Sequence, residues 1–247
     1  MSIMGLNSKW YHLMLEVANK AAKIPGVKRL LKPLYYPIKK RVEKSQRKKL
    51  MQNGIRILQL FDRCMQENGI EYTITFGTLL GAMREKGFIG HDIDIDVTVW
   101  NDQYSEQIAS ALKSAGFELV HAFRVEDGSI GREETYMCEG VAIDIFYIHD
   151  DGGKYPYYCV FAPIDGCPTF NQSMRTHGRI KARRMDIPMI KERERVPFES
   201  IELYAPTNAH EILSFIYGEN YMIPDPTWEM DPKRFNWMNK VAYYYEA

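Results

Sequence analysis

The chain has 247 residues, of which 45% are hydrophobic, and its formal net charge is zero. This length and composition are typical of a globular protein with its own core, and they exclude a disordered or fibrous chain. We find no run of the ~20 apolar residues that a membrane span needs and no apolar signal peptide, so we expect a cytoplasmic protein.

The zero net charge conceals an uneven distribution of charge along the chain. Residues 1–49 carry 13 Lys and Arg against 2 acidic residues, whereas residues 50–247 carry 19 against 30. Because proline interrupts helices, any long helix in this basic arm should be broken into short turns at Pro25, Pro33 and Pro37.

The basic arm has apolar residues between its charges, and this pattern favours attachment of residues 20–49 to an anionic membrane surface. The protein would then be peripheral on the inner face of the cell membrane. A solvated arm, or an arm that packs on the acidic body, is an equally good interpretation. Nothing else in the chain indicates a nucleic-acid partner.

We place the arm at residues 1–45 and a single catalytic domain at residues 46–247. Apolar periodicity and turn residues predict the following elements in chain order: a helix over 45–68, a strand over 72–76, a helix from Gly77 to Lys86, a strand over 92–99, a helix from Asn101 or Asp102 to Gly116, strands over 117–123, 135–138 and 141–149, a hairpin turn over 150–153, a strand over 155–161, an irregular basic stretch over 171–195, a strand over 198–204 and a helix from Asn208 to Tyr217. The remaining tail should wrap the surface.

Residues 92–99 read Asp-Ile-Asp-Ile-Asp-Val-Thr-Val, which predicts a strand with two unlike faces. Because side chains alternate along a strand, Asp92, Asp94 and Asp96 should share one face, and the other face should be apolar. Carboxylates ~7 Å apart repel one another unless a cation lies between them, and hard divalent cations prefer oxygen ligands. Since acids are poor strand formers, this pattern favours a Mg²⁺ or Mn²⁺ site over a solvated edge strand.

A strand-to-helix turn at Gly77 precedes the acidic strand. Gly77 lets the backbone come close to a phosphate, Thr78 adds a hydroxyl, and the N-terminus of the following helix favours an anion. Arg84 and Lys86 lie where they could bind phosphate oxygens, although an ion pair of Arg84 with Glu85 or Asp92 is an equally good interpretation.

Asp144 is a lone acid in the otherwise apolar segment 141–147. Without compensation, its burial would cost several kcal/mol. A metal ion, or a water that Asp144 deprotonates, would explain its presence. The order of helix, strand, Gly-Thr turn, helix and acidic strand is that of a nucleotidyltransferase core of the DNA polymerase β type, in which a third carboxylate comes from a neighbouring strand.

Three motifs resemble those of the LicD family: Gly77 to Arg84, Gly87 to Asp96, and Tyr217 to Pro226. The resemblance covers about residues 50–230. The family includes bacterial phosphocholine transferases and is related to fukutin-type ribitol-phosphate transferases. Gly90-His91 departs from its usual Pro-Trp, and Ile93 from its frequent Asp. The resemblance implies an α+β fold, with a nucleotidyltransferase core of mixed sheet flanked by helices.

The resemblance also implies an activity and a role for each site residue. Family members transfer phosphocholine or a polyol phosphate from a CDP-activated alcohol donor to a hydroxyl of a cell-surface glycan or glycolipid, and they release CMP. Asp94 and Asp96 would bind Mg²⁺ or Mn²⁺, with Asp92 beside them. Asp144 would be a third ligand or the base that takes the acceptor proton. Gly77, Thr78, Arg84 and Lys86 would contact the donor phosphate.

Other interpretations of the sequence remain open. A nucleotidyltransferase could use the same acids to transfer a nucleoside monophosphate, and a degenerate family member could be a binding module. A DxD glycosyltransferase fits less well, since no Rossmann-like half precedes the motif. An aromatic cage for choline at Tyr155, Tyr157, Tyr158 and Phe161 competes with an ordinary core role, and a zinc site at Cys138, Cys159 and Cys167 competes with reduced thiols.

Overall fold

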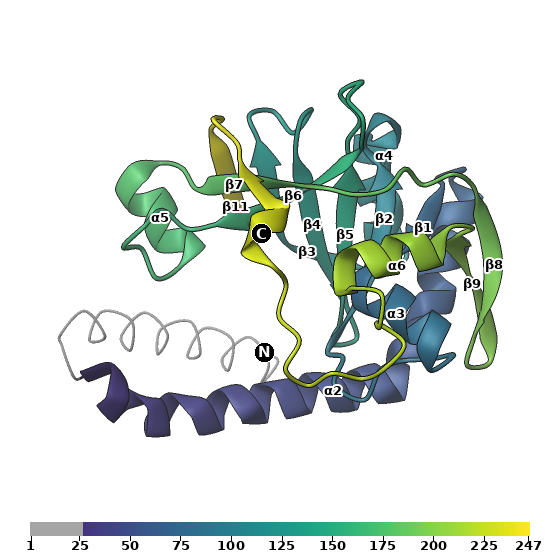
Figure 1. Ribbon diagram of the computed structural model, residues 1–247, viewed down its shortest axis with the longest axis horizontal. Helices are drawn as coiled ribbons and strands as arrows, with labels where there is room; N and C mark the ends of the chain where they lie inside the picture. The colour runs from purple at the N-terminus through teal and green to yellow at the C-terminus, as the bar shows by residue number, and fades with distance from the viewer. Residues whose placement is uncertain (1–26) are drawn as a thin grey trace.

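The structure is a computed structural model that describes residues 27–247, with side chains described from residue 40 onward. It confirms the expected α+β class, with a mixed sheet flanked by helices (Figure 1). A six-stranded sheet forms the centre, a three-stranded sheet lies beside it, and a two-stranded hairpin completes the fold.

The elements of the described residues follow in chain order: α2 (Val27–Glu67), β1 (Tyr72–Ile74), α3 (Phe76–Arg84), β2 (Asp94–Trp100), η1 (Asn101–Gln103), α4 (Glu106–Ser114), β3 (Glu118–Val125), β4 (Arg132–Cys138), β5 (Val141–Ile148), β6 (Tyr157–Ala162), α5 (Phe170–His177), β7 (Lys181–Asp186), β8 (Arg193–Phe198), β9 (Ile201–Pro206), α6 (Ala209–Tyr217), η2 (Pro232–Arg234), β10 (Phe235–Trp237) and β11 (Ala242–Glu246).

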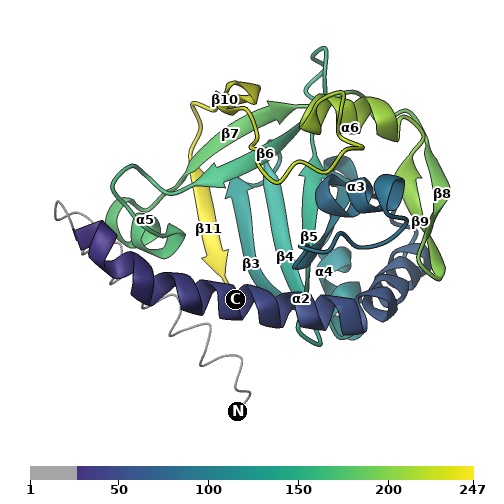
Figure 2. The ribbon, with the colours of Figure 1, turned by 60° about the horizontal axis from the view of Figure 1, so that its bottom comes forward.

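The central sheet has the strand order β1-β2-β5-β4-β3-β11, in which β2 and β5 are parallel and the other neighbours are antiparallel. Successive side chains of β2 and β5 point to opposite faces of the sheet. Ile95, Val97 and Ile143 are fully buried on one face, in a core shared with Leu58 and Phe61 of α2. Figure 2 shows α2 running along the sheet. The opposite face, which carries Asp94 and Asp96, is the one available for a site.

Helix α2 contradicts the prediction that prolines divide the arm. It runs from Val27 to Glu67 through Pro33 and Pro37, and across the predicted domain boundary at residue 45. Each proline removes one backbone donor from the hydrogen-bond ladder, and the donor that Pro37 lacks would have reached the carbonyl of Pro33. The rest of the ladder remains available to hold the helix. Residues 1–26, with Pro25 and part of the predicted membrane segment, lie outside the described residues.

The predicted irregular stretch over 171–195 is also wrong, because it contains parts of α5, β7 and β8. The hydroxyl of Thr169 caps α5 by accepting a hydrogen bond from Gln172 N, and Gly178 ends the helix with a φ of 65°. These local signals were present in the sequence. The strand β7 gave no such signal, because its two buried residues, Ala182 and Met185, are separated by two arginines and do not alternate with polar residues.

Two further predictions need smaller corrections. Ser105, and not Asn101 or Asp102, precedes α4, because residues 101–103 form a short 3₁₀ turn. The tail does more than wrap the surface, since β10 pairs with β7 and β11 pairs with β3. The turn over 150–153 brings β5 and β6 together in a single bridge, His149 to Tyr157, after which β6 joins the three-stranded sheet.

The burial of the apolar face gives a direct test of the fold. Ile143→Ala should lower the free energy of unfolding by about 2–5 kcal/mol, because a fully buried side chain leaves a cavity. Leu119→Ala is the matched control, since Leu119 is 38% exposed and its loss should cost about 0.5 kcal/mol or less. Urea titration measures both. Equal losses in the two variants would contradict the assigned faces.

Candidate functional site

A row of polar side chains crosses the central sheet on the face opposite α2. The strand register places these residues directly beside one another, from β2 to β11: Asp96, Asp144, Thr135, His121 and Glu246. Directly opposite residues in a sheet point to the same side and lie close enough to interact. The register therefore brings together residues that are far apart in the sequence, and the row includes two of the three predicted metal ligands.

The side chain of Asp144 is fixed by its neighbour in the row. Thr135 Oγ1 donates a hydrogen bond of 2.6 Å to Asp144 Oδ1, and His121 Nε2 lies 3.0 Å from the same hydroxyl. Because the one hydroxyl proton of Thr135 is given to Asp144, His121 Nε2 must be the donor to Thr135. A hydroxyl and an imidazole thus orient this carboxylate and leave its Oδ2 for other partners.

The turn into α3 holds the second acid. Gly77 N donates a 3.0 Å hydrogen bond to Asp96 Oδ2, and Asp96 N donates one of 2.9 Å to Thr78 Oγ1. A Cβ atom at Gly77 would lie 3.2 Å from Asp96 Oδ2 and 3.5 Å from Asp92 Oδ1. The absence of a side chain at Gly77 thus permits a close contact with the acids. Thr78 is 1% exposed and already bonded to the β2 backbone.

Asp92 lies outside the acidic strand, because β2 begins at Asp94. The prediction that Asp92 belongs to the same strand is therefore wrong. Its Oδ2 accepts a 2.8 Å hydrogen bond from Ile89 N and closes the turn before β2. Asp92 still belongs to the site, because its charge raises the pKa of Asp94 and Asp96.

Burial and mutual repulsion dominate the electrostatics of the acids. Burial, followed by the charges of Asp144 and Asp92, raises the pKa of Asp94 to about 7. Burial and then the charges of Asp94 and Asp144 raise the pKa of Asp96 well above its usual range. Burial also raises the pKa of Asp144, against the hydrogen bond from Thr135. None of the ion pairs among the described residues involves these three acids.

The donor set of the acids suits a hard divalent cation, since it consists of carboxylate oxygens whose charge no described Lys or Arg neutralises. The side chains are not arranged as a finished site, however. Within the part of the chain that the structure describes, no three His, Cys, Asp or Glu side chains are placed to hold one ion. One oxygen of Asp96 and one of Asp144 are occupied by hydrogen bonds. Two of the acids, together with water or substrate oxygens, form a ligand set that fits such a cation.

The two predicted basic residues take different positions. The side chain of Arg84 is 10% exposed and pairs with Glu85, at 3.0 Å between Nε and Oε1. Burial raises the pKa of Asp92, and the positive charge of Arg84 is one of the groups that oppose this shift, so Arg84 acts on this acid. Lys86 lies in the turn after α3 with an exposed side chain, and its carbonyl accepts a hydrogen bond from Glu199 N. The structure thus brings Arg84, but not Lys86, into contact with the residues around the acids.

Sequence reasoning missed Glu133, a fourth carboxylate on the same face. It lies on β4 two residues before Thr135 and pairs with Phe146 in the register. Burial, together with the charge of Asp144, raises the pKa of Glu133 to about 8. No sequence signal marked Glu133, His121 or Thr135, because their position beside the acids depends on strand register alone.

The aromatic and cysteine alternatives are not supported. Tyr157 and Tyr158 are 3% and 1% exposed, and Tyr158 Oη is 2.6 Å from Thr98 Oγ1, so both tyrosines have a core role. Tyr155 is exposed beside Lys154. All four cysteines are free thiols, and three of them are buried.

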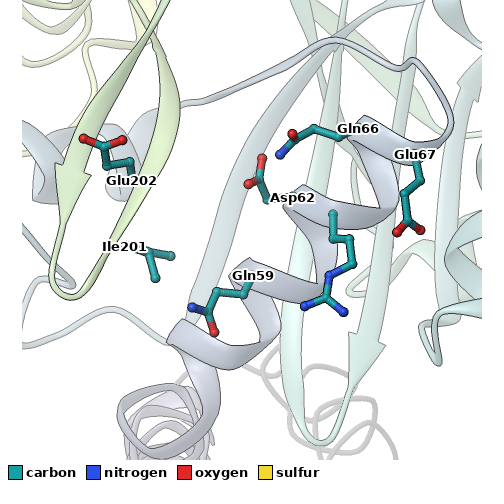
Figure 3. Close-up of a pocket in the computed structure, with 7 residues that line it drawn as sticks. Gln59, Asp62, Gln66, Glu67, Ile201 and Glu202 are labelled. Atoms are coloured by element: carbon teal, nitrogen blue, oxygen red, sulfur yellow. The ribbon is translucent and has the colours of Figure 1, made fainter.

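A pocket elsewhere in the molecule lies between α2 and the hairpin of β8 and β9 (Figure 3). One of its lining carboxylates, that of Asp62, already has partners. Asp62 accepts hydrogen bonds of 2.7 Å from Tyr72 Oη and 3.0 Å from Arg195. The pocket lies beside α2, away from the acidic face, and Asp62 links the helix to Arg195 of β8.

Comparisons with known proteins show the family to which the segment that carries the acids belongs. Residues 69–208 match the family described as LicD/FKTN/FKRP, nucleotidyltransferase domain. The mouse protein named ribitol-5-phosphate transferase FKTN is 24% identical over 175 residues, which are 70% of this chain and 34% of that protein. The Haemophilus influenzae protein named lipopolysaccharide cholinephosphotransferase LicD is 44% identical over 140 residues, 52% of this chain and 49% of that protein. The chain therefore spans about a third of the mammalian relative and half of the bacterial one.

The raised pKa of Asp94 predicts a specific dependence of stability on pH in the presence of a chelator. Between about pH 4 and pH 7 the folded protein holds a proton on Asp94 that the unfolded chain has released. The contribution of Asp94 to stability therefore falls as the pH rises through this window. Asp94→Asn should gain stability relative to the parent as the pH rises from 4 to 8.

Urea titrations at several pH values measure this difference. Asp102→Asn is the matched control, since Asp102 is exposed at the end of β2, and its difference from the parent should stay nearly constant. A parent that gains stability over Asp94→Asn as the pH rises would contradict the assigned environment of Asp94.

Proposed function

Because the chain belongs to the LicD/FKTN/FKRP family, we propose that it transfers a phospho-alcohol group from a CDP-activated donor to a hydroxyl of a cell-surface glycan or glycolipid. The observation that carries the proposal is the set of half-buried carboxylates beside the Gly77 turn, which repel one another. The relatives' names support transfer of a phosphate-containing group. The match to a nucleotidyltransferase domain supports a core of that kind.

In the proposed reaction, the acceptor oxygen forms a bond to the phosphorus that carries the alcohol. The bond from this phosphorus to the bridging oxygen of the diphosphate breaks, and CMP leaves with the electron pair. Asp144 takes the acceptor proton, since Thr135 fixes one of its oxygens and leaves the other available. The charge of Arg84 acts on Asp92, which lies beside Gly77, so Arg84 is the residue that would bind the donor phosphate there.

Asp94 and Asp96 are the residues that would hold Mg²⁺ or Mn²⁺. When bound, such an ion neutralises the charge of the diphosphate and of the leaving CMP. The protein's own contribution is to orient the two carboxylates by strand alternation and to fix Asp96 through Gly77 N. Binding of a cation would also relieve the repulsion that raises the pKa values of these acids.

The reaction products test the proposal. CMP should form when the protein is incubated with Mg²⁺, an acceptor glycolipid and one member of a panel of CDP-choline, CDP-ribitol and CDP-glycerol. Asp94→Asn and Asp96→Asn should each lower the rate by at least about a hundredfold, since both remove charge that acts on the diphosphate. Asp102→Asn, an exposed acid, should leave the rate unchanged.

Two outcomes would contradict this assignment. Undiminished transfer by a folded Asp94→Asn variant would show that Asp94 takes no part in the reaction. Release of pyrophosphate from a nucleoside triphosphate, with no CMP from any donor, would favour the second candidate function, transfer of a nucleoside monophosphate. This second candidate is supported by the description of the matching family, which names a nucleotidyltransferase domain.

We also propose that residues 20–49, which include the basic first part of α2, attach the protein to an anionic membrane surface. No helix among the described residues has the length and apolar character to cross a bilayer. The exposed side chains of Lys40, Lys44 and Lys48 lie four residues apart in the middle of α2. Basic residues near an anionic surface contribute about 1 kcal/mol each to binding.

Reversing these three charges tests the attachment. Lys40→Glu/Lys44→Glu/Lys48→Glu should weaken co-sedimentation with vesicles of phosphatidylcholine and phosphatidylserine by roughly a hundredfold. The matched control carries the same charge change on the exposed body, with Glu at positions now held by Lys113, Lys154 and Lys233. Equal binding by the two triple variants, or equal binding to vesicles without phosphatidylserine, would contradict the proposal.

A further inference from the structure

Tyr217 is the last residue of α6, and α6 lies beside α3 in both views of the molecule (Figures 1 and 2). Ile216 of α6 is buried in the same core as Leu79 of α3. The side chain of Arg84, at the end of α3, donates a 3.5 Å hydrogen bond to the carbonyl of Tyr221, four residues after Tyr217. The end of α6 and the segment that follows it are thus held to α3 and to Arg84.

The charges that act on Tyr217 show which groups its side chain lies near. Burial, followed by the negative charges of Asp96 and Asp92, raises the pKa of Tyr217, whereas the positive charge of Arg84 lowers it. Such charge effects weaken with distance, so the side chain lies close to all three groups. The hydroxyl therefore keeps its proton at neutral pH, and it can donate a hydrogen bond.

The hydroxyl of Tyr217 has no hydrogen-bond partner in the described part of the chain. The two acids that act on it each receive one hydrogen bond from elsewhere, because Gly77 N donates to Asp96 Oδ2 and Ile89 N donates to Asp92 Oδ2. The Tyr217 side chain is half-buried, and a tyrosine hydroxyl in such a position usually has an acceptor. Its proton is available to a ligand that binds beside the acids.

The ring of Tyr217 is held in place by the segment after α6. Trp228 Nε1 donates a 3.0 Å hydrogen bond to the carbonyl of Tyr217, and the two rings lie 4.6 Å apart between centroids. Trp228 is itself fixed in a turn, since its backbone N donates to the carbonyl of Asp225 at 3.2 Å. A donor that is already oriented loses less conformational entropy when a ligand binds.

We propose that the Tyr217 hydroxyl donates a hydrogen bond to an oxygen of the donor diphosphate. This inference rests on the proposed function, because the diphosphate is part of the CDP-activated donor. Asp96 would hold this diphosphate through a divalent cation and Arg84 would bind it directly, and Tyr217 lies near both residues. A neutral hydroxyl adds a donor there without pairing with the acids, whose charge the cation requires.

A purely structural role for Tyr217 is the competing explanation. The ring packs against the core that α3 and α6 share, so Tyr217 could serve only to hold the two helices together. Tyr217→Phe separates the two explanations, because it keeps the ring and its contact with Trp228 and removes only the hydroxyl. A structural role of the ring predicts that this variant binds and reacts like the parent.

The experiment measures binding of CDP and of inorganic pyrophosphate by calorimetry, each in the presence of Mn²⁺. Tyr217→Phe should weaken both by about tenfold, as expected for loss of a hydrogen bond to a charged group. With any CDP donor that the parent uses, kcat/KM should fall by a similar factor. Tyr104→Phe is the matched control, since the Tyr104 hydroxyl bonds to exposed Glu106 and its ring packs on Tyr147, away from the acidic face.

Binding of Mn²⁺ alone, followed by electron paramagnetic resonance, should be the same in Tyr217→Phe and the parent, and thermal unfolding verifies that the variant is folded. Four outcomes would overturn the inference: unchanged affinity for CDP, a loss with CDP but not with pyrophosphate, an equal loss of affinity for Mn²⁺ alone, and a parent that binds neither ligand. If the parent releases CMP from no donor, the proposed function fails, and the two binding measurements still test the contact of Tyr217 with a diphosphate.

Discussion

Repulsion among half-buried carboxylates is the constraint on which this site depends. Asp94, Asp96 and Asp144 are held on one face of the central sheet, and burial raises the pKa of each. The charges of neighbouring acids raise the pKa values of Asp94 and Asp96 further. Stability alone would not retain three such groups, because each costs free energy without a partner. The fold supports them with an apolar opposite face in which Ile95, Ile143 and their neighbours pack against α2. The cost of the acidic face is thus offset by the core behind it.

The same constraint explains why backbone and hydroxyl groups surround the acids. Gly77 N and the Thr135 hydroxyl each donate to a carboxylate without adding a positive charge. These donors orient the carboxylate oxygens and leave the net negative charge of the site unchanged, as required for binding a cation or a proton. Glu133 lies one row further along the same face, beside Phe123 and Phe146 in the strand register, and adds a fourth carboxylate to it.

Local pattern predicted the acidic strand and its two faces because the period of a strand is fixed by geometry. It also located Asp144 and the Gly77 turn. It could not find Thr135, His121 or Glu133, since these residues become neighbours of the acids only through the pairing of β3, β4 and β5. Asp92 was misplaced because the strand begins two residues later, where the turn closed by Ile89 N ends. The continuous α2 shows that proline alone is a weak guide to where a long helix stops.

The central claim is that the acids bind a divalent cation that the donor diphosphate shares. Titration of Mn²⁺ at neutral pH, followed by electron paramagnetic resonance, tests it most directly. The account predicts saturable binding by the parent that tightens in the presence of CDP-choline or CDP-ribitol. It predicts loss of that binding in a folded Asp94→Asn/Asp96→Asn variant. Equal binding of Mn²⁺ by the parent and the double variant, or no binding by the parent with any nucleotide, would contradict it.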